Sequence, residues 1–209
     1  MAATTITCPS CSAQHDVHNP GIIRFACPYC GSVVSWDEER VELAGRQSVL
    51  AEGFTRLYTG AAGSLHRSRF VVLGRARYRF ERGAWDEWFL EMEDGSIRWL
   101  TEDDHELALE TEADDVVVPP FANLGPGARL TLRDTTFVIQ EVGEAECIGL
   151  EGDLPRDFEL GERYPYADGS SPDGRYSLGI EYDADPPTVF VGRWLKANEL
   201  KLDDEGQDW

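Results

Sequence analysis

Long hydrophobic runs are missing from this 209-residue chain, in which no stretch approaches the roughly 18 apolar residues of a transmembrane helix. The N-terminal stretch MAATTITCPSC has neither a basic segment nor an apolar core, so we expect no secretory signal peptide. These two absences predict a cytoplasmic protein without membrane insertion.

Catalytic signatures are missing as well. The sequence has no phosphate-binding glycine loop, no nucleophile elbow and no HExxH motif, and its four histidines are scattered. A Ser–His–Asp arrangement is compatible with the sequence, although nothing indicates one. Cys147 stands in an apolar strand-like segment and is better interpreted as a buried thiol than as a nucleophile. We therefore predict that the protein is not an enzyme.

Positive charge is scarce. The chain has 19 lysines and arginines against 39 aspartates and glutamates, which gives a net charge of −20. A field of this sign repels phosphate backbones, so we expect no nucleic-acid binding. It favours a basic protein partner or a cationic small molecule, or it serves solubility alone.

Four of the five cysteines form two CxxC pairs, Cys8-Pro-Ser-Cys11 and Cys27-Pro-Tyr-Cys30, with fifteen residues between them. This spacing is typical of a zinc ribbon, in which two knuckles complete a tetrahedron of thiolates around one ion. We predict one structural Zn²⁺ per chain, because four thiolates leave no open position for a substrate. His15 and His18 are interpreted as solvated loop residues. Reduced thiols also agree with a cytoplasmic location.

Residues 70–100 read as three consecutive β-strands. Asp94-Gly95 is predicted to form a two-residue hairpin turn that places Leu90 opposite Trp99. In that register one buried face would collect five apolar side chains, namely Trp88, Leu90, Met92, Ile97 and Trp99.

The preceding strand places three arginines at alternate positions, and the WDEW motif adds a tryptophan and a glutamate on the face opposite Trp88. We consider these a candidate binding surface for a cation or a partner's arginine, consisting of Trp85, Glu87, Arg75, Arg77 and Arg79. The alternative is structural: Trp85 covers a second sheet, and Glu87 pairs with a strand arginine such as Arg79.

Frequent turn residues between short strands predict a mainly β protein, with a zinc ribbon followed by an antiparallel β-sandwich or barrel-like domain. Two segments are expected to be irregular: residues 101–115 as a short helix or loop, and residues 168–174, with Asp168 and Asp173, as a loop. The predicted divisions are a ribbon (1–40), a linker or short helix (41–58), a β-domain (59–198, with related halves 59–118 and 124–198) and an acidic tail (199–209). The relation between the halves rests on Gly63 before Phe70 and Gly127 before Phe137.

Several short motifs of the β-domain resemble a bacterial family, domain of unknown function 4178, over about residues 50–195. They are Phe70-Val-Val-Leu-Gly74, Tyr78, Trp85-Asp-Glu-Trp88, Asp94-Gly95, Trp99-Leu100, Gly152-Asp-Leu-Pro155, Gly161, Tyr176-Ser-Leu-Gly-Ile-Glu181 and Phe190-Val-Gly192. The resemblance implies no established activity. It does imply that a CxxC ribbon often precedes the domain, and that genes for polyamine-synthase-like enzymes and small membrane proteins lie nearby.

Together these observations predict a non-enzymatic, zinc-binding adaptor or accessory protein that acts through a protein partner. The alternative is a binding protein for a cationic metabolite such as a polyamine, with Trp85 and Glu87 at its site, or an accessory subunit of a polyamine-related enzyme.

Overall fold

The computed structural model describes residues 4–36, 41–47, 55–65, 67–196 and 198–203. Nearly all of the regular structure in these ranges is β-strand, and their single helix is the three-residue 3₁₀ turn η1 (Phe121–Asn123). Within the same ranges, no helix is long and apolar enough to cross a membrane. The prediction of a mainly β protein is confirmed.

The N-terminal ribbon contains a hairpin of β1 (Thr4–Thr7) and β2 (Gln14–Val17), followed by β3 (Arg24–Ala26) and β4 (Ser32–Trp36). β4 pairs with β5 (Val41–Gln47), so a strand begins where a linker or short helix was predicted. Residues 48–54 of that predicted linker lie outside the described residues. The ribbon has its own small core of buried side chains, which includes Ile6, Val17, Ile22, Phe25 and Val34.

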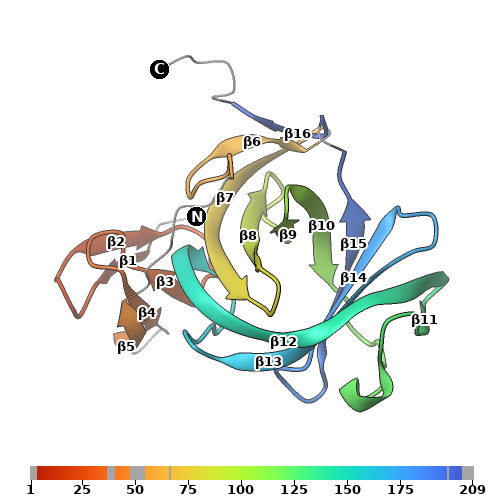
Figure 1. The fold of residues 1–209 in the computed structure, drawn as a ribbon. Coiled ribbons are helices and arrows are strands. Elements are labelled where there is room, and N and C mark those ends of the chain that lie inside the picture. The colour runs from red at the N-terminus through yellow and green to blue at the C-terminus, as the bar shows by residue number, and fades with distance from the viewer. Residues whose placement is uncertain (1–3, 37–40, 48–54, 66, 197, 204–209) are drawn as a thin grey trace.

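In the described part of the chain, eight antiparallel strands close into a barrel (Figure 1). Going round the barrel, each strand pairs with the next, and β12 pairs with β7 to complete the ring. Of the two predicted architectures, the structure is therefore the barrel. Its strands in ring order are β7 (Ser68–Arg79), β8 (Ala84–Met92), β9 (Ile97–Asp103), β10 (Glu106–Glu112), β15 (Thr188–Trp194), β14 (Tyr176–Glu181), β13 (Arg163–Ser170) and β12 (Thr135–Leu154). The strand β10 lies in the segment 101–115, where a short helix or loop was expected.

The barrel consists of two runs of strands with the same arrangement. In the first run the short strand β6 (Ala62–Leu65) pairs with the long strand β7, and β8, β9 and β10 follow. In the second run the short strand β11 (Arg129–Leu132) pairs with the long strand β12, and β13, β14 and β15 follow. The backbone contacts repeat too: Gly60 N–H donates to Val72 O, and Gly127 N–H donates to Ile139 O. The glycine equivalent to Gly127 is thus Gly60, not the expected Gly63.

Residues 199–203, which were predicted as the start of an acidic tail, include the strand β16 (Leu200–Leu202). It pairs with β6, and Leu200 and Leu202 are buried against the outer wall of the barrel. The alternation of leucine and lysine explains this, because a strand with one apolar face packs wherever a sheet edge lies beside an apolar surface. Residues 204–209 lie outside the described residues.

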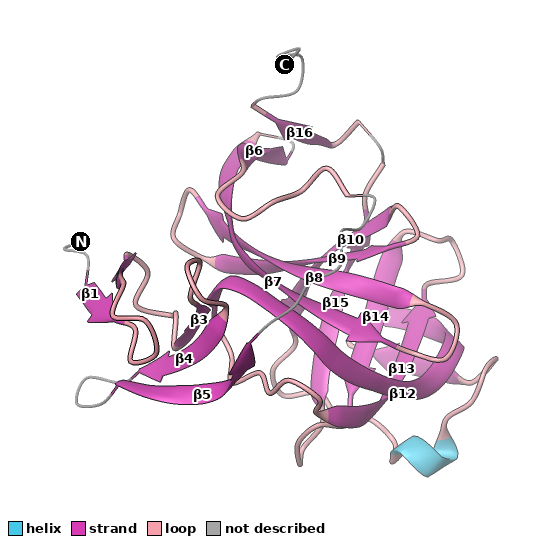
Figure 2. Ribbon diagram, turned by 60° about the vertical axis from the view of Figure 1, so that its left-hand side comes forward, coloured by secondary structure: helices cyan, strands magenta, loops and turns pink. Residues whose placement is uncertain are grey.

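The ribbon and the barrel share one sheet, because the end of the long strand β12 pairs with β3 over Gly152–Leu154 (Figure 2). Gly152 has φ of +69°, and a Cβ atom there would lie 2.3 Å from Leu73 O. Only glycine satisfies both conditions, so a single residue permits the crossing from barrel to ribbon.

The hairpin of β8 and β9 differs from its prediction by one residue. Met92 N–H donates to Ser96 O, and Gly95, with φ of +79°, closes a three-residue loop. A positive-φ glycine at the third loop position is typical of a bulged turn, and it shifts the register. Phe89 rather than Leu90 lies opposite Trp99.

This shift changes the face of every residue on β9, because strand side chains alternate. Trp99 lies on the inner face of the barrel, whereas Trp88 and Leu90 belong to the outer core with Leu100. The prediction that Trp99 shares a face with Trp88 was wrong.

Candidate functional site

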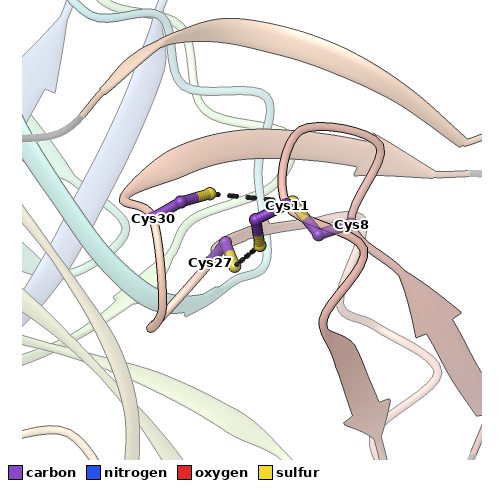
Figure 3. A group of neighbouring side chains, drawn as sticks. All are labelled: Cys8, Cys11, Cys27 and Cys30. Atoms are coloured by element: carbon purple, nitrogen blue, oxygen red, sulfur yellow. Dashed lines mark hydrogen bonds between the residues drawn. The ribbon is translucent and has the colours of Figure 1, made fainter.

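The four cysteines of the ribbon converge as predicted (Figure 3). Their sulfur atoms all lie within 4.8 Å of one another, with Cys8 and Cys30 at 3.8 Å and Cys11 and Cys27 at 3.7 Å. Tight turns hold both knuckles: Ser12 N–H donates to Cys8 O, and Gly31 N–H donates to Cys27 O. The cluster could therefore hold a metal ion.

His15 is not the solvated loop residue that was expected. Its Nε2 lies 2.6 Å from Asp153 Oδ1 on β12, and its ring stacks on Phe25 at 4.3 Å between centroids. The side chain thus joins the ribbon to the barrel. His18 is exposed, in agreement with the expectation.

A second candidate site is a cavity of about 220 Å³ inside the barrel. Inward-facing positions of six strands bring carboxyl groups to it, and three of these groups, from Glu87, Glu110 and Glu181, are almost completely buried. Asp168 also lines the cavity, but its side chain is exposed. The carboxylate-bearing residues that line the cavity are Glu87 on β8, Asp103 on β9, Glu106 and Glu110 on β10, Glu141 on β12, Asp168 on β13 and Glu181 on β14.

Burial makes these groups poor anions. It raises the pKa of Glu87 and of Asp168 well above the usual range, and the charges of Glu181 and Glu110, respectively, add to the effect. The pKa of Glu110 is also raised by burial, although its carboxylate accepts a hydrogen bond from Thr101 at 2.8 Å. The cavity thus concentrates carboxyl groups whose charged forms lack solvation.

Aromatic rings form much of the remaining wall. Trp85 and Tyr166 lie 5.1 Å apart, and Trp99 and Phe190 lie 5.6 Å apart, measured between ring centroids. Glu87 Oε2 is buried without a hydrogen-bond partner among the described residues. An unpartnered buried acceptor of this kind is unusual in a folded protein and can mark a ligand site.

Among the described residues, two arginines pair with carboxylates of this acidic group: Arg82 pairs with Glu141, and Arg156 reaches Glu181. Arg156, in the loop after β12, lies 3.0 Å from Glu181 and 2.8 Å from Asp183. Tyr164 also donates a hydrogen bond to Glu181 at 3.0 Å. Burial still raises the pKa of Glu181 above its usual value, so the arginine offsets the loss of solvation only in part.

The structure divides the five residues that were predicted as one binding surface. Trp85 and Glu87 line the cavity, whereas the three arginines of β7 point outward. Arg75 and Arg77 both approach Asp86, and Arg79 approaches Glu146 at 3.0 Å. The β7–β8 register explains the split, because Arg77 lies opposite Asp86, and Glu87 lies opposite Ala76. Glu87 therefore does not pair with Arg79.

The remaining acidic residues of the cavity were not identified from the sequence. Asp168 was expected in a loop, but it lies in β13 and follows Tyr164 and Tyr166 on the inner face. The alternation Tyr-x-Tyr-x-Asp was the available signal. It could not be read without knowing that this face lines the cavity of a closed barrel.

The fold and the site together define a small eight-stranded β-barrel, within the described residues, with an acidic interior and an N-terminal four-cysteine ribbon. Residues 58–197 match the family model described as domain of unknown function (DUF4178), and the chain belongs to that family. The resemblance recognised from short motifs is thereby confirmed, and the function of the family is unknown. No curated protein and no solved structure matches the chain.

Proposed function

We propose that the protein binds a small organic cation inside its barrel. The observation that carries this proposal is the group of seven carboxylates around the cavity, three of them buried, with walls of tryptophan and tyrosine. Among the described residues, the arginines that pair with these carboxylates are Arg156, with Glu181, and Arg82, with Glu141. Ammonium groups would supply the missing counter-charge, and aromatic faces attract cations. The proposal is for a binding protein and not for an enzyme.

An organic cation fits this cavity better than a metal ion. Within the described residues, the cysteine cluster is the only group of three or more potential ligands whose donor atoms lie close enough to share an ion. The carboxylates of the cavity are spread over six strands instead. Dispersed negative groups suit a molecule with two or more separated amines, and polyamines are such a class.

The test is calorimetric titration of the full chain with spermidine, in parallel with MgCl₂ and with NaCl at matched ionic strength. We expect saturable binding of spermidine and a rise in melting temperature that neither salt reproduces. Equal effects of all three solutes would show non-specific screening and contradict the proposal. Saturable Mg²⁺ binding with no response to spermidine would replace the organic cation by a metal ion.

We propose further that the ion of the cysteine cluster is Zn²⁺ with a structural role. A tetrahedron with Zn–S bonds of about 2.3 Å has edges of about 3.8 Å, which agrees with the Cys8–Cys30 and Cys11–Cys27 sulfur distances of 3.8 and 3.7 Å. Metal analysis of freshly purified protein should find about one zinc per chain. Such a site requires reduced thiols, in agreement with a cytoplasmic location.

An adaptor function is the second candidate, with the ribbon as the docking module. It is supported by exposed apolar side chains on the ribbon: Tyr29 in the second knuckle is 75% exposed, and Leu43 on the edge strand β5 is 53% exposed. A partner recovered with the wild-type protein should be lost with the double variant Tyr29→Ser/Leu43→Ser. Retention of the same partner by that variant would remove the ribbon surface from consideration.

A further inference from the structure

The two halves of the barrel differ at one edge, and this difference points to a docking site. In the first half, β6 has two neighbours, β7 and β16. In the second half the equivalent strand β11 pairs with β12 alone among the described residues. Figure 1 shows β6 with β16 at the top of the barrel and β11 at the lower right, with no strand beside its outer edge.

The backbone of β11 is prepared for a partner. On β6, the carbonyl of Ala62 faces outward and accepts a hydrogen bond from Asp203 N–H at 3.0 Å. Arg129 and Thr131 occupy the positions on β11 that Ala62 and Ser64 occupy on β6. Their N–H and C=O groups therefore lie on the free edge, because backbone groups of a strand alternate between its two neighbours.

A groove of about 340 Å³ lies beside the β11–β12 hairpin, over the outer wall formed by β10, β15 and β14. Its floor is apolar and includes Leu132, Phe137, Ala113 and Val191. In the first half, the leucines of β16 cover the corresponding wall and are buried with Phe70 and Trp88. The groove is thus the place where a second strand like β16 would lay its apolar side chains.

The rim of the groove is basic, although the protein carries a net charge of −20. Arg98, Arg133 and Arg193 line it, and the carboxylate among its lining residues, that of Glu110, is buried and hydrogen-bonded to Thr101. Within the described residues, neither Arg98 nor Arg133 has a carboxylate at ion-pair distance; each donates only a long hydrogen bond, of 3.4 Å, to a backbone carbonyl. Two unpaired arginines beside an apolar floor favour an acidic occupant.

We propose that β11 and this groove bind an extended segment of a partner protein that has alternating apolar side chains followed by carboxylates. The segment would add a strand to the free edge of β11, place its apolar side chains on the floor and pair its carboxylates with Arg98 and Arg133. The chain's own strand β16 has this composition, since Leu200 and Leu202 alternate and Asp203 pairs with Arg69 at 2.7 Å. The inference does not depend on cation binding inside the barrel.

The test uses the full chain and a fluorescein-labelled peptide, ELKLDDEG, which copies residues 199–206. Fluorescence anisotropy should show saturable binding, and a control peptide with both leucines replaced by serine should not bind. The double variant Arg98→Gln/Arg133→Gln should weaken binding by about tenfold or more, because the peptide loses its charge-assisted hydrogen bonds to both side chains. The matched control Arg163→Gln, an exposed arginine on β13, should bind as the wild type does.

A backbone variant separates strand addition from simple charge attraction. Thr131→Pro removes an edge N–H that β12 does not use, and proline is tolerated on edge strands. It should weaken peptide binding while the circular dichroism spectrum and melting temperature stay near those of the wild type. Amide hydrogen exchange should show new protection at Thr131 on adding the peptide, which also tests the site without any substitution.

Four outcomes would overturn the proposal. They are an absence of peptide binding, unchanged binding in the arginine variant, new protection confined to Ser64 on β6, and a concentration-dependent dimer that protects Thr131 without peptide. The last would assign the groove to a second copy of the chain. Asp168 lies in the cavity and not in the groove, so the Asp168→Asn variant should bind the peptide as the wild type does. The groove and the proposed cation site can therefore fail separately.

Discussion

Replacing Asp168 by asparagine should change stability and cation binding in opposite directions. The side chain is exposed at the cavity, yet the surrounding barrel removes part of its solvation, and this loss followed by the charge of Glu110 raises its pKa well above the usual range. In an unfolded chain the pKa of an aspartate is about 3.9. Between that value and the raised native pKa, the folded protein binds more protons than the unfolded chain does.

The consequence for stability follows from this difference. The free energy of unfolding falls as the pH rises from about 4 through the native pKa of Asp168, because ionisation is penalised only in the folded state. Asparagine has nearly the same shape and does not ionise. Asp168→Asn should therefore lose less stability than the wild type between pH 5 and pH 8, as measured by urea unfolding at both values.

Binding should respond in the other direction. If spermidine occupies the cavity, the variant loses one charge-assisted hydrogen bond, worth roughly 1.5–3 kcal/mol. Because about 1.4 kcal/mol corresponds to a factor of ten, the dissociation constant should rise roughly 10- to 150-fold. Isothermal titration calorimetry at pH 8 measures this change directly.

Glu93→Gln is the matched control, because it makes the same chemical change in the exposed β8–β9 loop. It should alter neither the pH dependence of unfolding nor spermidine binding. The reasoning is refuted if Asp168→Asn binds spermidine as tightly as the wild type does, since the cavity would then not be the site. Equal pH dependence of stability in the two proteins would show that the carboxylate is not desolvated.

Four further predictions test other parts of the structure. Arg156→Met should lower the free energy of unfolding by about 3–5 kcal/mol, because it leaves the Glu181 carboxylate buried without its arginine partner. Chemical unfolding at neutral pH measures this loss, and a loss below about 1 kcal/mol would mean that solvent reaches the ion pair. Gly152→Ala should lower the free energy of unfolding by more than about 1 kcal/mol, because the positive φ of Gly152 and its close approach to Leu73 O exclude a side chain. An unchanged melting temperature would contradict the role of Gly152 where β12 passes from the barrel to the ribbon. Burial raises the pKa of the Cys147 thiol to about 12, so iodoacetamide at pH 8 should label it only after unfolding, as mass spectrometry of native and denatured samples can show. If the proposed zinc ion stabilises the small ribbon core, chelation should increase hydrogen exchange in β3 and β4 before it does so in the barrel. Simultaneous opening would mean that the two parts unfold as one unit.

The sequence by itself determined the local features of this protein. The two CxxC pairs require only nearby residues to turn inward, so their convergence followed from spacing. Strand-forming segments and turn residues indicated a mainly β chain, and the short motifs between Phe70 and Gly192 identified its family. These signals are legible because each depends on a few consecutive residues.

The tertiary structure decided which strand faces point inward. Gly95, with its positive φ, shifted the β8–β9 register and moved Trp99 to the inner face of the barrel. A bulge after Val72 in β7 placed Phe70 on the outer face and Tyr78 on the inner face. Such single-residue shifts are invisible to an alternation pattern, yet they exchange the two faces of a strand.

Closure of the barrel decided the chemistry of the interior. Glu87, Glu110, Asp168 and Glu181 are spread over almost a hundred residues of sequence, and each by itself resembles a solvated surface carboxylate. Pairing of β12 with β7 brings them to one cavity, where the three glutamates are buried and the negative charges repel one another. An acidic composition became an acidic site because the desolvation of a carboxylate depends on everything that surrounds it in space, which only the closed barrel specifies.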